Sequence, residues 1–280
     1  MDVKAHAKIN LSLDLLGIRD DGYHEILTVM QTLELHDILE ITPLDREIRV
    51  ESSHPEVPAG RENIVCRAAE LLANEYRCAK GVRIVIRKNI PVSAGLAGGS
   101  SNAAAALLAL NRLWGLSATE DDLFRLGARL GSDVPFCLLG KTALAGGRGE
   151  VLTPLPPLPG LGVVLVKPPF GVSTAKVYRL YDDLQPGPGP DTEAVIRAMR
   201  AGDLKALAGL LGNVLERVTV SLYPEIKGIK KALLSAGAFG SLMSGSGPTV
   251  FGLCPGPGEA REVASRISLP GCQIIATETI

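Results

Sequence analysis

A segment rich in glycine and serine has the composition of a phosphate-binding loop. It reads PVSAGLAGGSS over residues 91–101, between an alternating apolar run that predicts a strand and an alanine-rich run that predicts a helix. Glycines let a backbone approach a ligand closely and adopt positive φ, so that consecutive N–H groups can surround an anion. The following helix would add unpaired N–H groups and the positive end of its dipole. The segment therefore predicts a phosphate site, whose serine hydroxyls could also help to hold Mg²⁺.

The loop matches neither of two common nucleotide-binding motifs, because it lacks the patterns G-x-x-x-x-G-K-[ST] and G-x-G-x-x-G. A flexible strand–helix turn capped by serine is the alternative interpretation. Pro91 at the entry and the uncharged helix that follows favour phosphate binding, but they leave the reaction open. A second glycine segment, MSGSGPT over residues 243–249, is either another anion-binding turn or a structural turn.

Two charged residues are candidates for phosphoryl-transfer chemistry, which needs a group to take or orient the acceptor proton and a positive charge near the phosphoryl group. Asp133 follows a predicted helix end and precedes Pro135, so the alternative interpretation is a helix N-cap. Lys8 lies on a predicted strand and shares one face with Asn10 and Ser12. Solvent exposure would explain that face without a function. The functional alternative is that Lys8 pairs with Asp133 and stabilises its charge.

Tyr23 and His24 come after Gly22, just beyond a predicted turn at Arg19-Asp20-Asp21. An aromatic ring beside an imidazole suits a flat heterocycle, because the ring can stack and the imidazole can hydrogen-bond. A Tyr-His pair also occurs often without any function.

Strands and helices must position these residues. Strands are predicted at 3–16, 26–42, 46–52, 82–87, 163–166, 249–253 and 272–278, and helices at 62–79, 102–114, 117–131, 191–201, 203–217 and 224–236. Gly115 would end the second helix, and Ser117 with Glu120 would form a capping box for the third. The Pro/Gly-rich stretch 152–162 predicts a connector and 185–190 an exposed loop. We expect two α+β domains, residues 1–155 and 156–280.

Length and composition exclude several classes of protein. A chain of 280 residues that is 46% hydrophobic and 21% charged has ordinary globular usage, which argues against disorder and coiled coil. The net charge of −1 gives no electrostatic footprint for nucleic acid. Five widely spaced cysteines without a C-x-x-C pair suggest free thiols in a reducing compartment. We expect neither a signal peptide nor a membrane span, and therefore a cytoplasmic location.

Five segments in this order resemble the GHMP kinase superfamily, and the resemblance extends over about residues 4–255. They are Lys8-Ile-Asn10-Leu, Gly22-Tyr23-His24, the loop from Gly95 to Ser101, Gly131-Ser-Asp133-Val-Pro, and the turn from Ser244 to Thr249. The resemblance implies an α+β fold with an N-terminal ribosomal-protein-S5-like domain and a C-terminal ferredoxin-like domain, and an active site in the cleft. The first two segments resemble members that use ATP and Mg²⁺ to phosphorylate the 2-hydroxyl of a cytidine diphosphate-linked methylerythritol, in the non-mevalonate isoprenoid pathway.

By this resemblance, Asp133 is the general base and Lys8 is its electrostatic partner. Asn10 would orient the substrate, while Tyr23 and His24 would hold the cytosine. In the segment from Gly171 onward, Tyr178 would be a second stacking ring and Thr174 a polar contact. The residues implied in ATP binding are Pro91, Val92, Ser93, Ala94, Gly95, Leu96, Ala97, Gly98, Gly99, Ser100 and Ser101, with Asn63 a candidate for the adenine pocket.

Two departures from the superfamily pattern bear on this assignment. Ala97 replaces a glycine found in many members, and its methyl group is tolerated if its φ is negative. Asn102 stands where an acidic residue could follow the serines, so Ser100 is a possible metal ligand and the metal ligands stay unknown.

Three alternatives stay open at this point. They are another kinase of the superfamily, of the homoserine or mevalonate kinase type, a non-catalytic nucleotide-binding protein on the same scaffold, and an RNA-binding module. The set of Tyr23, His24 and Tyr178 suits a cytosine better than a polyol or an amino acid. Lys8 and Asp133 argue against a non-catalytic role, and the net charge of −1 argues against RNA.

Overall fold

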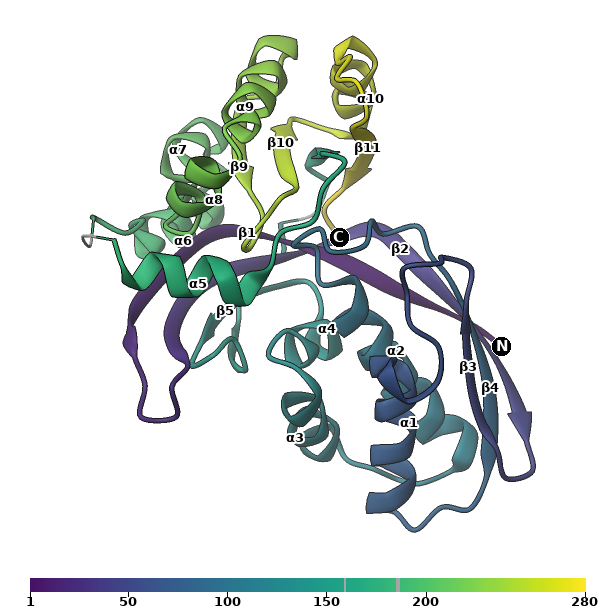
Figure 1. The fold of residues 1–280 in the computed structure, drawn as a ribbon. Coiled ribbons are helices and arrows are strands. Elements are labelled where there is room, and N and C mark those ends of the chain that lie inside the picture. Colours follow the sequence, from purple (N-terminus) through teal and green to yellow (C-terminus); the bar gives the residue numbers. More distant parts are fainter. Residues whose placement is uncertain (159, 185–186) are drawn as a thin grey trace. The chain divides into compact units, whose positions relative to one another are not determined.

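Two compact units interleave along the chain in the computed structural model, which describes residues 1–158, 160–184 and 187–280 (Figure 1). The first unit comprises residues 1–7, 35–92 and 97–140, and the second comprises 8–34, 93–96 and 141–280. The long strands β1 (Asp2–Ile18) and β2 (His24–Leu44) contribute residues to both units. The division into one domain of residues 1–155 and another of residues 156–280 stays a prediction.

The first unit combines a small sheet with a group of helices. The second half of β2 pairs antiparallel with β4 (Gly81–Arg87), and β3 (Ile48–Ser52) pairs parallel with β4. The helical elements are η1 (Gly60–Glu62), α1 (Ile64–Glu75), α2 (Gly98–Trp114), α3 (Glu120–Leu130) and α4 (Val134–Leu139). Figure 1 shows these four α-helices gathered beside β3 and β4. The alternation of Val82, Ile84 and Ile86 gives β4 a fully buried face toward the helices, as its sequence predicts.

Alanines allow α2 to pack closely within this core. Residues 103–106 are four consecutive alanines, and all of them are buried. Side chains this small let the backbones of α1 and α2 approach one another, and the two helices share the core with Leu72, Leu107 and Leu110. The helix begins at Gly98, four residues before the predicted start at residue 102, so the glycines and serines of the loop form its first turn. Gly115 ends it with φ of 68°, as predicted.

The N-terminus of α3 is capped two residues later than the sequence pattern suggests. Thr119 and Asp122 form the capping box, and the prediction of Ser117 with Glu120 is wrong. Ser117 has a φ of 57°, which is incompatible with the extended backbone of an N-cap residue. The end of α3 before Gly131 agrees with the prediction.

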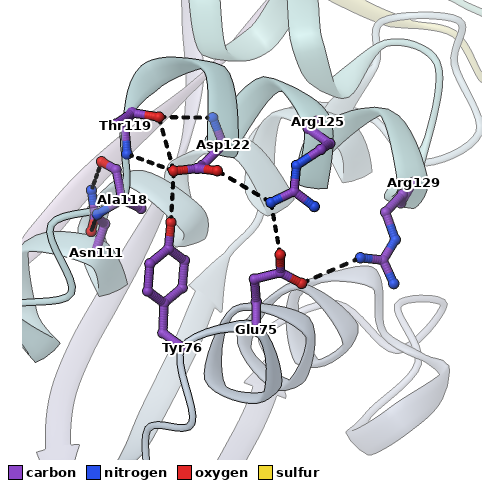
Figure 2. A network of polar contacts seen from close by, with 8 residues as sticks. All are labelled: Glu75, Tyr76, Asn111, Ala118, Thr119, Asp122, Arg125 and Arg129. Atoms are coloured by element: carbon purple, nitrogen blue, oxygen red, sulfur yellow. Dashed lines mark hydrogen bonds and ion pairs between the residues drawn. The ribbon is translucent and has the colours of Figure 1, made fainter.

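The Asp122 carboxylate is the centre of a polar network that joins α3 to the C-terminal end of α1 (Figure 2). It accepts hydrogen bonds from the hydroxyls of Thr119 (2.8 Å) and Tyr76 (2.9 Å) and from the guanidinium of Arg125 (3.2 Å). The hydroxyl of Thr119, followed by that of Tyr76, holds the pKa of Asp122 well below its usual range. Arg125 also pairs with Glu75 on α1 at 2.7 Å. The network therefore fixes the two helices to one another at the surface.

The second unit contains an antiparallel four-stranded sheet of ferredoxin-like topology. Its strands are β7 (Gly162–Lys167), β9 (Gly240–Met243), β10 (Val250–Cys254) and β11 (Gln273–Glu278), in the order β11-β7-β10-β9. Helices α9 (Glu225–Ala236) and α10 (Pro257–Arg266) complete a β-α-β-β-α-β order and contact each other. The sheet's apolar core includes Val164, Val166 and Val250.

The rest of the second unit surrounds the first half of β2 and the part of β1 after residue 7. The strand β5 (Thr142–Gly146) pairs antiparallel with both β2 and β6 (Val151–Pro154), and β8 (Gly212–Asn213) pairs parallel with β1. The helices are α5 (Thr174–Asp182), α6 (Thr192–Ala201), α7 (Leu204–Leu210) and α8 (Glu216–Leu222).

Several sequence predictions of elements need correction. The helix predicted over 203–217 is two helices separated by β8, because Asn213 turns its amide to the backbone of the second glycine segment. The connector predicted over 152–162 contains most of β6. The short elements α4, α5, α10, β5 and β9 were not predicted. Gln185 and Pro186 of the predicted exposed loop lie outside the described residues. In the described part of the chain, no helix is both long and apolar enough to span a membrane.

Candidate active site

The phosphate loop, defined as residues 91–101, connects β4 to α2 and has an unusual backbone. Alternate residues in its centre have positive φ: 51° at Ser93, 73° at Gly95 and 55° at Ala97. Left-handed residues that alternate with ordinary ones direct successive N–H groups toward one side, which is the geometry of an anion nest. The backbone of the loop is therefore suited to phosphate, as the sequence predicts.

Ala97 adopts a strained conformation in this loop. Its φ of 55° and ψ of 27° lie in the left-handed region, so the negative φ that would accommodate its methyl group without strain is not adopted. A residue with a Cβ atom loses about 1–2 kcal/mol there relative to the right-handed region. The surrounding loop imposes this conformation at the N-cap of α2, where the backbone changes direction into the helix.

A buried carboxylate, which the sequence analysis did not identify, fixes the chain as it enters the loop. Asp37 is fully buried, and its Oδ1 accepts hydrogen bonds from the backbone N–H groups of Asn89 (2.7 Å) and Ile90 (2.8 Å). Its Oδ2 pairs with the ammonium group of Lys88, which is also buried. A Cβ atom on Gly98 would lie 3.1 Å from that ammonium nitrogen, so the ion pair lies directly beside the loop.

The second glycine segment, residues 243–249, packs against the first part of the phosphate loop. The hydroxyl of Ser244 donates to the carbonyl oxygen of Gly95 at 2.9 Å, and the N–H of Thr249 donates to that of Ala94 at 3.4 Å. A Cβ atom on Gly95 would lie 2.3 Å from the carbonyl oxygen of Ser244, so only glycine fits. Among the described residues, the buried hydroxyl of Thr249 has no hydrogen-bond partner.

Side chains from two other elements, β8 and α5, hold the second glycine segment in place. The amide of Asn213 donates to the carbonyl oxygens of Met243 (2.8 Å) and Gly245 (2.7 Å). The hydroxyl of Thr174, at the start of α5, lies 2.8 Å from that of Ser246. The predicted polar residue Thr174 therefore belongs to this turn, and Asn213 is a positioning residue that the sequence analysis missed.

Lys8 and Asn10 are buried side by side on β1. Lys8 is only 4% exposed, so solvent exposure does not explain this pair. Its ammonium group donates to Oδ1 of Asn10 at 2.8 Å, and Nδ2 of Asn10 donates to the hydroxyl of Thr28 at 2.8 Å. The backbone N–H of Lys8 donates to the carbonyl oxygen of Leu96 at 3.2 Å. Lys8 is therefore attached to the phosphate loop, and its ammonium group is oriented by the Asn10 amide.

Asp133 occupies the N-cap position of α4, followed by Val134 and Pro135. Among the described residues, the Asp133 side chain forms no capping hydrogen bond to this helix, so capping does not explain the carboxylate. Nearby in the same unit, a Cβ atom on Gly131 would lie 3.8 Å from the hydroxyl oxygen of Ser100. Lys8 and Asp133 belong to different units, and their pairing stays a prediction.

Asn63 has a structural role at the start of α1. Its Oδ1 accepts from the N–H of Val65 at 2.9 Å, and its Nδ2 donates to the carbonyl oxygen of Pro58 at 2.8 Å. Both ends of the amide are thus engaged in the helix cap. A role in the adenine pocket stays a prediction.

The turn between β1 and β2 presents Tyr23 and is fixed by charged groups. The Asp21 carboxylate accepts a hydrogen bond from the N–H of Tyr23 (3.1 Å), which lowers the pKa of Asp21. Glu25 pairs with Arg19 (2.6 Å) and accepts a hydrogen bond from the N–H of Gly147 (2.8 Å). The hydrogen bond from Arg19 has the larger effect, and together the two contacts lower the pKa of Glu25. Both carboxylates therefore stay charged and fix the turn.

Tyr23, His24 and Tyr178 all belong to the second unit. Tyr23 is exposed, and the guanidinium of Arg148 lies 4.7 Å from the centroid of its ring. The rings of His24 and Tyr178 contact each other at a centroid distance of 5.0 Å and an angle of 58°. Nε2 of His24 lies 2.6 Å from Oδ1 of Asp182. The sequence predicts the three rings, but it gives no indication of Arg148 or Asp182.

Within the second unit, the structure thus brings together most of the predicted binding residues. They are Lys8, Asn10, Tyr23, His24, the loop residues 93–96, Thr174, Tyr178 and the second glycine segment. The first unit brings together Pro91, Val92, Ala97–Ser101 and Asp133, and it also contains Asn63. The second unit thus contains a buried ammonium group and a group of aromatic rings, and the first unit contains a carboxylate and the N-terminus of α2.

Comparison with known proteins identifies related chains over the whole length. The model of the N-terminal domain of GHMP kinases matches residues 63–141, and that of the C-terminal domain matches residues 195–271. A protein of Pelotomaculum thermopropionicum named 4-diphosphocytidyl-2-C-methyl-D-erythritol kinase is 53% identical over 98% of this chain and 96% of its own length. A protein of the same name from Moorella thermoacetica is 48% identical over 100% of this chain and 99% of its own.

Solved structures extend the comparison to the fold. A crystal structure of 4-(cytidine 5'-diphospho)-2C-methyl-D-erythritol kinase has a TM-score of 0.84 and 38% identity, and it covers 100% of this chain and 99% of that chain. A homoserine kinase from Cytophaga hutchinsonii has a TM-score of 0.77 at 19% identity, over 100% of this chain and 94% of its own, which indicates a shared fold alone. The prediction of an α+β fold with two GHMP kinase domains is confirmed.

Proposed function

The chain belongs to the 4-diphosphocytidyl-2-C-methyl-D-erythritol kinase family of GHMP kinases, and we propose that its substrate is 4-diphosphocytidyl-2-C-methyl-D-erythritol. The γ-phosphoryl group of ATP passes to the 2-hydroxyl of the methylerythritol moiety, and ADP and a proton are released. The reaction belongs to the non-mevalonate route to isoprenoid precursors, and we propose that it takes place in the cytoplasm.

The contact of His24 with Tyr178 is the single observation that supports this substrate best. It brings the imidazole of His24, at the start of β2, against the phenol ring of Tyr178 on α5. Tyr23 is exposed on the turn that precedes β2. A cytosine ring stacks on aromatic side chains at about 1–3 kcal/mol per ring, and its polar edge requires hydrogen-bonding groups such as an imidazole. Homoserine and mevalonate have no flat ring that would use these groups.

The phosphate loop and the N-terminus of α2 hold the triphosphate of ATP in this proposal. The alternating left-handed residues of the loop, from Ser93 to Ala97, provide backbone N–H groups. The helix then adds the unpaired N–H groups of its first turn, which begins at Gly98. The buried pair of Asp37 and Lys88 has little net charge and holds the entry of the loop rigid.

Asp133 accepts the proton of the acceptor hydroxyl as the phosphoryl group arrives. Lys8 supplies positive charge to the carboxylate and to the transferred group, and the Asn10 amide orients it. An ammonium group as buried as that of Lys8 acts in a medium of low dielectric constant, where its field is stronger than in water. Asn10 thus positions Lys8, and through it the reacting groups.

Mg²⁺ fits the chemistry of the groups in the first unit. In the described part of the chain, no cluster of three or more His, Cys, Asp or Glu side chains could enclose a metal ion. Mg²⁺ does not need such a cluster, because it commonly binds through one or two protein oxygens, phosphate oxygens and water. The Ser100 hydroxyl, beside Gly131, is the protein group that would hold it, together with phosphate oxygens and water. The ion would neutralise charge on the phosphates.

A coupled assay of ADP release against a panel of acceptors tests the proposed function. The panel contains 4-diphosphocytidyl-2-C-methyl-D-erythritol, homoserine, mevalonate and water. We expect turnover with the cytidyl compound at a kcat/KM at least about 10³-fold above that for the other acceptors. Comparable turnover on homoserine or mevalonate would exclude the substrate, and ADP release with water alone would exclude a kinase with this acceptor.

A further inference from the structure

Two side chains of α5 converge on one imidazole. Tyr178 and Asp182 are four residues apart and therefore lie on the same face of the helix. The Tyr178 ring contacts the His24 ring, and the Asp182 carboxylate contacts its Nε2 atom at 2.6 Å. The His24 side chain is only 10% exposed and that of Asp182 is 37% exposed. Together these contacts fix both the plane and the rotation of the imidazole.

The position of Asp182 is unfavourable for the helix taken alone. It is the last residue of α5, and Asp183 follows as the C-cap. Negative charge at a helix C-terminus is repelled by the negative end of the helix dipole. A residue that conflicts with its local structure is commonly retained for a contact elsewhere, and here that contact is with His24.

We propose that Asp182 is a specificity-determining residue, which fixes the tautomer of His24 and so selects cytosine over uracil. The inference rests on the proposed function, since it concerns the base of the same cytidyl substrate. Asp182 does not touch the base in this proposal. It acts through His24, as a carboxylate does when it orients an imidazole in other sites.

The argument follows from the hydrogen-bonding capacity of imidazole. A carboxylate can only accept, so Nε2 of His24 carries a proton that it donates to Asp182. In the neutral imidazole, Nδ1 then has no proton and presents a lone pair. The Tyr178 ring, packed against the imidazole, hinders the rotation that would exchange the two nitrogens. The neutral imidazole of His24 is therefore held as a hydrogen-bond acceptor at Nδ1.

Cytosine and uracil differ in the group that such an acceptor would meet. Cytosine has an exocyclic amino group, which donates, whereas uracil has a carbonyl oxygen at the same position, which accepts. A fixed lone pair at Nδ1 attracts the amino group and repels the carbonyl oxygen. A site that holds one hydrogen-bonding pattern rejects the opposite pattern strongly, because a buried group is left without a partner.

The test compares kcat/KM for the cytidyl substrate with that for its uridyl analogue, in the full chain. Asp182→Asn keeps the size of the side chain, but its amide can accept from Nε2–H or donate to an unprotonated Nε2, so it satisfies either tautomer. Asp182→Glu keeps the carboxylate. Asp183→Asn removes the neighbouring charge at the same helix end and serves as the matched control.

We expect the wild-type enzyme and Asp183→Asn to have the same preference for the cytidyl substrate, within about 3-fold. Asp182→Asn should reduce that preference at least about 10-fold, mainly through KM, and Asp182→Glu should restore most of it. If Asp182→Asn turns over the cytidyl substrate with an unchanged preference, the inference is wrong. If the wild-type enzyme does not turn over the cytidyl substrate at all, the proposed function is wrong instead.

Nitrogen-15 NMR of the histidine side chains gives a second measurement that does not depend on activity. The chemical shifts of Nδ1 and Nε2 report which nitrogen carries the proton, and His24→Gln assigns the signals. We expect neutral His24 in the wild-type protein to carry its proton on Nε2. A proton on Nδ1 of the neutral ring would overturn the proposal.

Discussion

The hydroxyl of Ser244 donates a hydrogen bond to the carbonyl oxygen of Gly95, at 2.9 Å across 149 positions of sequence. This contact joins the two glycine segments, which the sequence shows only as separate motifs. Because the Gly95 backbone has a φ of 73° and lies against Ser244, the phosphate loop depends on the second segment for its shape.

Gly95→Ala should therefore destabilise the protein. The left-handed conformation alone costs about 1–2 kcal/mol, and the new methyl group would collide with the Ser244 carbonyl oxygen, so the free energy of unfolding should fall by more than that. Urea denaturation measures the change. Gly99→Ala is the control from the same loop, since a Cβ atom there meets nothing closer than Ile64, at 3.7 Å. Equal stability of the two variants would contradict the packing described.

Ala97→Gly should have the opposite effect. Glycine adopts a φ of 55° without the strain of a Cβ atom, which offsets its larger loss of backbone entropy on folding. We expect the free energy of unfolding to rise by up to about 1 kcal/mol. Ala103→Gly, within α2 and buried, should instead lower it by about 1 kcal/mol or more. A loss of stability in both variants would show that Ala97 is not strained.

Asp133→Asn should remove activity without removing ATP binding. General base catalysis contributes about 10²–10⁴-fold, so we expect kcat to fall within that range while the Kd for ATP changes little. The melting temperature should stay near the wild-type value, because the side chain does not cap α4 among the described residues. Turnover measured by ADP release, with ATP binding measured by calorimetry, checks both parts. A kcat within about 3-fold of wild type would remove Asp133 from the mechanism.

Tyr178→Leu should weaken binding of the cytidyl substrate. Loss of one stacked ring costs about 1–3 kcal/mol, so KM should rise by about 5- to 150-fold with a small change in kcat. Tyr178→Phe keeps the ring and is expected to leave KM within about 3-fold. If both variants behave alike, the ring does not contribute by stacking.

Asp122→Asn should change the dependence of stability on pH. The hydroxyl of Thr119 is the main cause that lowers the pKa of Asp122 in the folded protein. The charged network is therefore stabilising at pH values above the pKa of Asp122 in the unfolded chain, which is about 3.9. That stabilisation is lost as the pH falls toward the lower pKa of the folded state. The wild-type protein should therefore be more stable than Asp122→Asn at neutral pH, and the difference should shrink as the pH falls below about 4.

Unfolding by urea at several pH values measures this difference. Asp121→Asn, the neighbouring residue in the first turn of α3, is the matched control and should show a smaller pH dependence relative to wild type. A constant difference between wild type and Asp122→Asn at all pH values would show that the network of Figure 2 does not depend on this charge.

Local patterns in the sequence were sufficient for much of the fold. Alternation predicted the buried face of β4, and glycine predicted the end of α2, because these features depend on neighbours in sequence. The short elements α4, α5 and β9 escaped prediction, since packing rather than propensity makes them ordered. The cap of α3 was misplaced by two residues because the left-handed φ of Ser117 has no clear sign in the sequence.

The sequence by itself determined which residues could do chemistry: a glycine loop for phosphate, a lysine beside an asparagine, an aspartate before a helix and a Tyr-His pair. Only the tertiary structure decided how they are held. It buried Lys8 against Asn10, joined Gly95 to Ser244, placed Asp37 beneath the loop and set Asp182 against His24. Each of these contacts links side chains to partners through space. A local pattern cannot specify them, because their partners are set by the register of strands and the packing of helices.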